Sequence, residues 1–194
     1  MANTNAPFGF RQYSGTGSAP TYEQVPVRIA YDATNIFFGD PVTPTNGGLV
    51  VQGAGSDAQT AGVFVGCQYL SVSQKRTVWS NYWPGSDVAA TNYVTGYIVN
   101  DPNAKFLAQV GATGLVVADV NSNIDYTIGS GNTMSGISAA FLDQGSLATT
   151  STLPFRVVGL VTEPPGAPGT AAGAYNYAIV SFNNVSTKAL TSVG

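Results

Sequence analysis

The acidic side chains are the residues of this chain best able to carry chemistry, because it contains ten Asp and Glu residues and no histidine. Without histidine it lacks the commonest general base and the commonest metal ligand, and no Ser-His or Cys-His nucleophile pair can form. A glycosidase that works with two carboxylates needs no histidine, but the acids are scattered and no spacing pairs two of them. The residue types therefore favour a protein that is not an enzyme, with a carboxylate-only glycosidase as an alternative.

One segment resembles a calcium-binding loop, because oxygen-bearing side chains alternate along it at Asp119, Asn121, Asn123 and Asp125. Two elements of such a loop are missing. Ile124 stands where the sharp turn needs glycine, and Ser130 stands where the bidentate glutamate belongs. We therefore predict a polar turn between strands, with no metal and no cofactor.

Three aromatic residues lie close together ahead of the turn Pro84-Gly85: Trp79, Tyr82 and Trp83. Such rings can stack on a sugar, but an aromatic cluster before a turn more often covers a core or an interface. We interpret the cluster as part of a protein interface. A host-surface or polysaccharide-binding adhesin is the alternative.

The composition indicates a component of an assembly. Only 9% of the residues are charged and the net charge is −3, against about 25% charged residues in an average protein. A surface of Ser, Thr, Asn, Gln and Gly keeps monomers apart poorly, so we expect self-association, most simply as a homotrimer. No basic run could neutralise phosphates and no apolar stretch is long enough to span a membrane, so we expect neither a nucleic-acid nor a membrane partner.

Short alternating segments separated by Gly and Pro predict an all-β fold, a single barrel or sandwich of about eight to ten strands. The alternation is clearest over 23–32 and 61–69, and Cys67 in the second segment is predicted to be a buried thiol. Asn46-Gly47-Gly48 is typical of a hairpin turn. The remaining predicted strands are 76–82, 93–99, 105–110, 114–120, 124–128, 154–162 and 174–182, and a short helix is allowed only over 135–142.

Residues 1–22 show no strand or helix period and are predicted to form an extended N-terminal arm, ahead of an all-β domain at 23–194. Their aromatic side chains make the arm adhesive. We therefore expect the arm to dock on a neighbouring subunit or on a larger shell, and the alternative is that it packs on its own domain. The predicted interface residues are Pro7, Phe8, Phe10, Arg11, Tyr13 and Tyr22 of the arm, with Trp79, Tyr82 and Trp83.

Several stretches resemble small head proteins of tailed bacteriophages. The opening Asn5-Ala-Pro-Phe-Gly-Phe-Arg11 is similar to the start of such proteins, and further similar stretches are Gly62–Tyr69, Trp79–Pro84, Val99–Pro102, Leu153–Leu160 and Val180–Asn183. The resemblance implies a capsid decoration or cement protein, often a trimer, that binds the major capsid protein between capsomers and stabilises the head. It implies assembly in the host bacterial cytoplasm and a place on the capsid surface of the virion. No catalytic residue follows from it.

Overall fold

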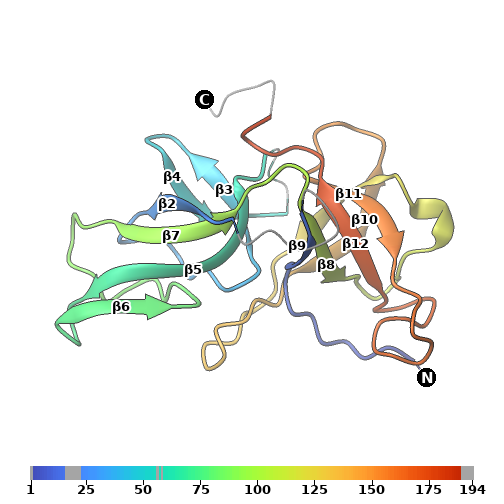
Figure 1. The fold of residues 1–194 in the computed structure, drawn as a ribbon, viewed down its shortest axis with the longest axis horizontal. Coiled ribbons are helices and arrows are strands. Elements are labelled where there is room, and N and C mark those ends of the chain that lie inside the picture. The colour runs from blue at the N-terminus through green and yellow to red at the C-terminus, as the bar shows by residue number, and fades with distance from the viewer. Residues whose placement is uncertain (1, 16–22, 56, 58, 189–194) are drawn as a thin grey trace.

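The computed structural model describes residues 2–15, 23–55, 57 and 59–188. Over these residues twelve strands form two six-stranded sheets, and the one 3-10 turn among them, η1, spans Val117–Asp119 (Figure 1). The first sheet, called here the C-terminal sheet, has the order β1 (Arg11–Ser14), β8 (Lys105–Gln109), β12 (Tyr177–Phe182), β11 (Phe155–Leu160), β9 (Asn123–Thr127) and β10 (Phe141–Ala148). The second has the order β3 (Pro41–Thr45), β4 (Leu49–Gln52), β2 (Val25–Ile29), β7 (Val94–Val99), β5 (Gly62–Ser71) and β6 (Arg76–Ser80).

The second sheet closes into a barrel. Strand β3 pairs with β4 and also with β5, through Pro41 opposite Val63 and Val42 opposite Gly62, so that β3, β4, β2, β7 and β5 form a ring. Strand β6 continues the sheet beyond the ring and, among the described strands, pairs with β5 alone. We call this unit the N-terminal barrel. The all-β class expected from the sequence is thereby confirmed.

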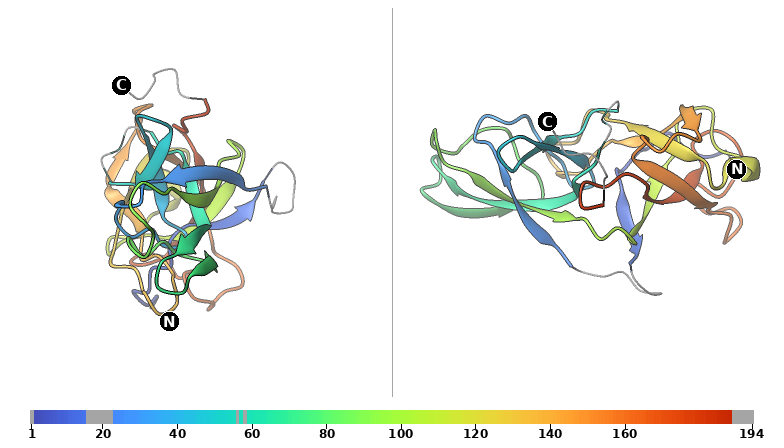
Figure 2. Two further views of the ribbon diagram at one scale, coloured as in Figure 1. Left: turned by 90° about the vertical axis from the view of Figure 1, so that its left-hand side faces the viewer. Right: turned by 90° about the horizontal axis from the view of Figure 1, so that it is seen from above.

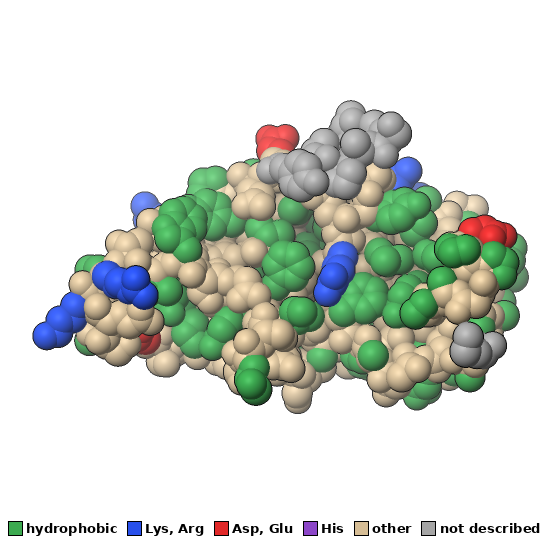
Figure 3. Space-filling view, turned by 60° about the horizontal axis from the view of Figure 1, so that its bottom comes forward, with side chains coloured by type: hydrophobic (Ala, Val, Ile, Leu, Met, Phe, Trp, Pro, Cys, Tyr) green, Lys and Arg blue, Asp and Glu red, His purple; other side chains and the backbone are tan. Residues whose placement is uncertain are grey.

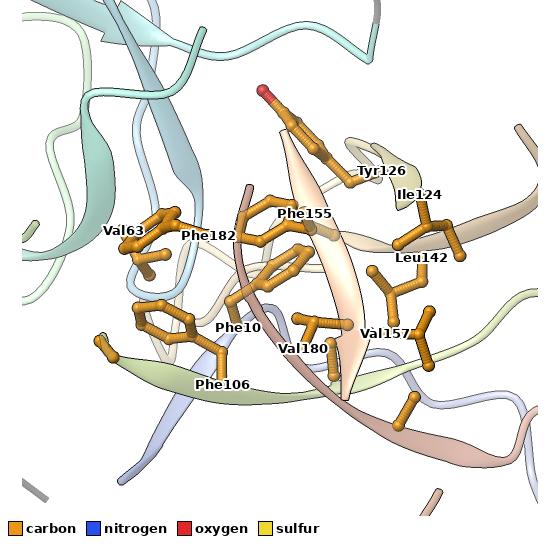
Figure 4. Packing of buried hydrophobic residues seen from close by; sticks show 14 of the residues in the cluster. Phe10, Val63, Phe106, Ile124, Tyr126, Leu142, Phe155, Val157, Val180 and Phe182 are labelled. Carbon is orange, nitrogen blue, oxygen red and sulfur yellow. The ribbon is translucent and has the colours of Figure 1, made fainter. Parts of the chain in front are cut away.

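Each sheet encloses its own hydrophobic core, and the two units lie side by side along the long axis of the molecule (Figures 1 and 2). The core of the C-terminal sheet is rich in aromatic rings, which pack against aliphatic side chains (Figure 4). Its largest fully buried side chains are Phe10, Phe106, Leu115, Ile124, Tyr126, Leu142 and Phe155. The core of the N-terminal barrel is centred on Ile29, Ile36, Phe64, Trp83 and Ile98.

Residues 36–40 join the two units. The backbone N–H of Phe38 donates to Gly136 O at 2.9 Å, and Gly39 connects both sides, donating to Phe64 O and accepting from Phe10 N, each at 2.8 Å. The chains approach closely here: a Cβ on Gly9, whose φ is 74°, would lie 2.7 Å from the Cβ of Ser138. Glycine is therefore needed at this position.

A β-bulge in β5 divides its side chains between the two cores. The register shifts between Phe64 and Gly66, so Phe64 faces the N-terminal barrel together with Cys67 and Tyr69, whereas Val63 packs in the core of the C-terminal sheet. Strict alternation over 61–69 would have put Val63, Cys67 and Tyr69 on one face and Phe64 on the other. That face assignment is wrong, because the extra residue of a bulge reverses the side-chain pattern.

Most predicted strands are present, and the hairpin at Asn46-Gly47-Gly48 is confirmed, since β3 and β4 pair across it from Thr45 opposite Leu49. Two predictions are wrong. Residues 135–142 form no helix, because Phe141 and the residues after it pair with β9 as β10. Residues 114–120 form no strand and contain η1 instead, where the Asp119 carboxylate accepts the Val116 N–H at 2.8 Å.

Candidate functional site

The N-terminal segment lies on the chain's own body. Phe10 is 1% exposed, its ring stacks on Phe155 with centroids 4.6 Å apart, and it meets Tyr126 edge-on at 6.0 Å. Strand β1 follows at once and pairs with β8 in the C-terminal sheet. Residues 2–15 thus pack on their own chain, which was the alternative to an arm docked elsewhere, and Phe10 is a core residue, because its ring lies in the aromatic cluster of the C-terminal sheet.

The other predicted interface residues of this segment lie nearer the surface. Pro7 and Phe8 are half-buried, with the Phe8 ring edge-on to Tyr177 at 5.2 Å and the Arg11 guanidinium over Phe8 at 5.2 Å. Tyr13 on β1 is 53% exposed. Among the described strands β1 pairs with β8 alone and ends the C-terminal sheet, so it is an edge strand, the kind of strand to which a partner strand can be added. The predicted interface residue Tyr22 lies outside the described residues.

The structure separates the three aromatic residues that the sequence places together. Trp83 is fully buried in the N-terminal barrel, where its indole N–H donates to Ala33 O at 3.2 Å, so its expected role in an interface is wrong for this chain. Tyr82 is half-buried with its ring stacked on Phe37 at 5.5 Å. Trp79 on the edge strand β6 is 67% exposed. Of the three, Trp79 is therefore the one whose side chain is mostly exposed to solvent.

A groove runs along β5 from the junction of the two units onto the N-terminal barrel. It consists of two hollows of about 340 and 310 Å³, which share Gln24 and Val65 in their walls. Arg11 lies in the wall of the larger hollow and Trp79 in that of the smaller one, so the fold brings residues from the two predicted interface stretches to one groove. Figure 3 shows a face on which hydrophobic side chains alternate with uncharged polar ones and charged groups are few. The lining residues of the larger hollow are Phe10, Arg11, Gln12, Gln24, Phe38, Val63, Val65, Val99 and Phe106.

The stacking of Trp79 on Tyr97 was not predicted from the sequence. Trp79 stacks on Tyr97 of β7 with centroids 5.7 Å apart and an angle of 16° between the planes. Strand β5 runs between β6 and β7, and Gly66, opposite Tyr97 in the register, has no side chain to separate the rings. The period of β7 could have indicated the face of Tyr97, but only the strand order could have paired it with Trp79.

A buried carboxylate holds the two units together. Asp40 is fully buried and accepts hydrogen bonds from Ser138 Oγ at 2.5 Å, Gln52 Nε2 at 2.7 Å and Phe37 N at 2.8 Å. Gln52 ends β4 of the N-terminal barrel, and Ser138 precedes β10 of the C-terminal sheet. Burial raises the pKa of Asp40, and its three hydrogen bonds oppose that rise. All three partners are donors, so the carboxyl group has a structural role between the units.

The fold also brings two acids together, which sequence spacing could not do. Asp125 on β9 lies opposite Asp143 on β10 in the strand register. Burial is the main cause that raises the pKa of Asp125 to about 6; the negative charges of Asp143 and Asp57 add to the rise and the Tyr126 N–H opposes it. Neither member of the pair lines the groove.

Asp125→Asn tests the energetic effect of this pair. The pKa of Asp125 is about 6 in the folded state and about 4 in the unfolded state. This difference contributes to the stability of the fold in full below about pH 4, and the contribution disappears as the pH rises through about 6, where folded Asp125 loses its proton. We expect Asp125→Asn to raise the free energy of unfolding near pH 7 by about 1 to 2 kcal/mol, with little change near pH 4. Urea unfolding at both pH values measures it. The exposed-site control Asp32→Asn should change neither value, and equal stability of Asp125→Asn and the wild type at pH 7 would contradict the argument.

The remaining predicted features are structural. Cys67 is buried as expected, its Sγ–H donates to Tyr82 O at 3.4 Å, and burial raises the pKa of its thiol to about 12. In the segment that resembles a calcium loop, the Asn123 amide donates to Thr150 O at 2.8 Å. Among the residues that the structure describes, no three His, Cys, Asp or Glu side chains gather to hold a metal ion.

Comparison with known proteins finds no matching family model, no matching curated protein and no matching solved structure. Within the described part of the chain, no helix is long and apolar enough to cross a membrane. The functional interpretation therefore depends on the groove, the β1 edge and the sequence resemblance.

Proposed function

We propose that this chain is a virion structural protein, a cement or decoration subunit that binds the outer surface of the major capsid protein shell between capsomers of a tailed-phage head. The observation that carries the proposal is the position of β1 as the end strand of the described C-terminal sheet, with the Tyr13 side chain exposed on it. An edge of this kind can accept a strand from another protein, with backbone hydrogen bonds supplying affinity and neighbouring side chains supplying specificity.

The resemblance to phage head proteins supports β1 as the surface that binds the capsid. The similar stretch Asn5–Arg11 leads directly into β1, and Arg11 lies both in the groove wall and over the Phe8 ring. The stretch Gly62–Tyr69 contributes mainly buried strand residues, so it bears on the fold, whereas buried and exposed residues alternate at the start of β11 in Leu153–Leu160. The opening stretch leads into the edge strand β1, and the stretch Trp79–Pro84 begins on the edge strand β6, where Trp79 is exposed.

Self-association would turn a weak contact into stable attachment. In a homotrimer each subunit would contact a different capsid protein molecule, and linkage of the contacts can raise the overall affinity over one contact by roughly 10² to 10⁴. The low charge of the surface favours such assembly. Light scattering of the isolated protein at micromolar concentration should give a trimeric mass. A strictly monomeric mass would contradict a trimer formed before attachment.

Cosedimentation with emptied heads of the phage that encodes the chain tests the proposal. We expect the wild-type protein to sediment with the heads, and the double variant Arg11→Ala/Tyr13→Ala to bind about tenfold more weakly or worse, because it removes the side chains that flank the β1 edge. Tyr93→Ala is the matched control, since Tyr93 is 58% exposed and lies outside the groove. A wild-type protein that stays in the supernatant would overturn the capsid function. A double variant that binds like the wild type would overturn docking through β1.

A further inference from the structure

We propose that the smaller hollow of the groove is a binding site for a neutral saccharide, with Trp79 as its stacking platform. The proposal is independent of capsid attachment, which we assign to the β1 edge. It concerns a surface of the N-terminal barrel, formed by β5, β6 and β7. The hollow is lined by Gln24, Val65, Gly66, Cys67, Trp79, Ser80, Asn81 and Tyr97.

The two stacked rings provide a rigid apolar platform. Trp79 is 67% exposed, and Tyr97 packs parallel to it, so one face of the indole is supported by Tyr97 while much of the ring remains open to solvent. The Tyr97 hydroxyl donates to Gln68 Oε1 at 3.4 Å, which restrains its ring. Burying an exposed indole face is favourable, and the C–H groups on one face of a pyranose ring can pack on it.

The walls beside the platform are polar and uncharged. Gln24, Ser80 and Asn81 supply amide and hydroxyl groups, and none of the eight lining residues carries a formal charge. Sugar hydroxyls both donate and accept hydrogen bonds, as amide and hydroxyl side chains do. A phosphorylated or strongly acidic ligand would need cationic partners, which this hollow lacks.

The position of Asn81 is fixed by the rest of the fold. Its side-chain Nδ2 donates to Ser135 O at 2.7 Å, and the Tyr82 N–H donates to Ser80 Oγ at 3.2 Å. These bonds use one donor of the amide and one acceptor site of the hydroxyl, and leave the amide oxygen and the hydroxyl proton for a ligand. The volume, about 310 Å³, is at the small end of the range for small-molecule sites, about 300 to 1,000 Å³. It suits a short segment of a glycan.

Titration of the full-length protein with neutral oligosaccharides tests the site. The probes are maltohexaose, cellohexaose, laminarihexaose and N-acetylchitohexaose, at concentrations up to the millimolar range, and the readouts are tryptophan emission and calorimetric heat. The chain has two tryptophans, and Trp83 is fully buried, so a saturable emission change reports on Trp79. We expect at least one probe to bind. If none gives a saturable change in either readout, the proposal is overturned.

Matched variants locate the binding. Trp79→Ala should weaken the affinity about tenfold or more, whereas Trp79→Phe, which keeps a smaller ring, should weaken it less. Tyr93→Ala, an exposed aromatic residue outside the hollow, should bind like the wild type. Unchanged melting temperatures establish that each variant is folded. Undiminished binding by Trp79→Ala, or preference for an uncharged peptide over every saccharide, would overturn the proposal.

Failure of this inference and failure of the capsid function give different results. A protein that binds emptied heads but no saccharide lacks the glycan site and keeps the proposed structural role. A protein that binds a saccharide but no heads has the glycan site and lacks the proposed structural role. Trp79→Ala should therefore sediment with heads like the wild type, and Arg11→Ala/Tyr13→Ala should keep its saccharide affinity.

Discussion

Replacing Asp40 by Ala is expected to lower the free energy of unfolding by about 3 kcal/mol or more, because it removes the buried acceptor shared by three donors, two of them buried and one half-buried. Ser138 Oγ and Gln52 Nε2 would lose their common partner, and they belong to different units of the fold. The loss should thus act at the junction as well as locally. Urea unfolding followed by tryptophan emission, which reports on buried Trp83, measures the change.

Two control variants separate this effect from a loss of charge. Asp40→Asn keeps an acceptor oxygen but turns an amide N–H₂ toward donors. The free energy of unfolding of Asp40→Asn should therefore lie between those of the wild type and Asp40→Ala. Asp32→Ala removes an exposed carboxylate and should change the stability by no more than about 0.5 kcal/mol. A cost for Asp40→Ala as small as that of Asp32→Ala would show that the carboxylate does not hold the units together.

Phe10→Ala is expected to lower the free energy of unfolding by about 3 to 5 kcal/mol, the usual range for removing a fully buried phenyl ring. The ring stacks on Phe155 and meets Tyr126, so its removal leaves a cavity among aromatic side chains that cannot close around it (Figure 4). Thermal and urea unfolding measure the loss. Deleting residues 1–22 should be at least as harmful, because it also removes β1.

Tyr13→Ala is the matched control for this prediction. It removes an aromatic ring from the same segment, three residues along the chain, but that ring is 53% exposed and contributes little to the core. We expect a change within about 0.5 kcal/mol. A truncated protein starting at Glu23 that melts like the wild type would show that the N-terminal segment is dispensable for folding.

Sequence patterns predicted those strands whose two faces differ in polarity. The segment Val25–Ile29 alternates cleanly because one side faces the barrel and the other faces solvent, and β7 and β8 follow the same rule. Strand β10 was not predicted because Phe141–Ala148 is partly buried on both faces and its apolar residues stand at the two ends, without alternation, around Asp, Gln, Gly and Ser. Its pairing with β9, a tertiary contact, decides its conformation.

The sequence indicated which residues could form a binding site, but it could not predict which of them lie together or at the surface. Trp79 and Trp83 are four residues apart, yet one is exposed on an edge strand and the other is buried, because the backbone of Trp83 leaves β6 and exchanges both hydrogen bonds with Ile36. The burial of Phe10 could not be predicted either. Its neighbours in the sequence are Gly and polar residues, and its partners Tyr126 and Phe155 are far along the chain.

The place of β1 in the sheet has a consequence for the order of folding. Strands β2 to β7, which build the N-terminal barrel, lie between β1 and its partner β8 in the sequence. During synthesis the barrel can close as soon as β7 has emerged, whereas β1 stays unpaired, with the Phe10 ring exposed, until β8 and the later strands arrive. We therefore expect two kinetic phases in refolding. The barrel should fold in the faster phase, and β1 should pair with β8 in the slower phase, when the C-terminal sheet forms.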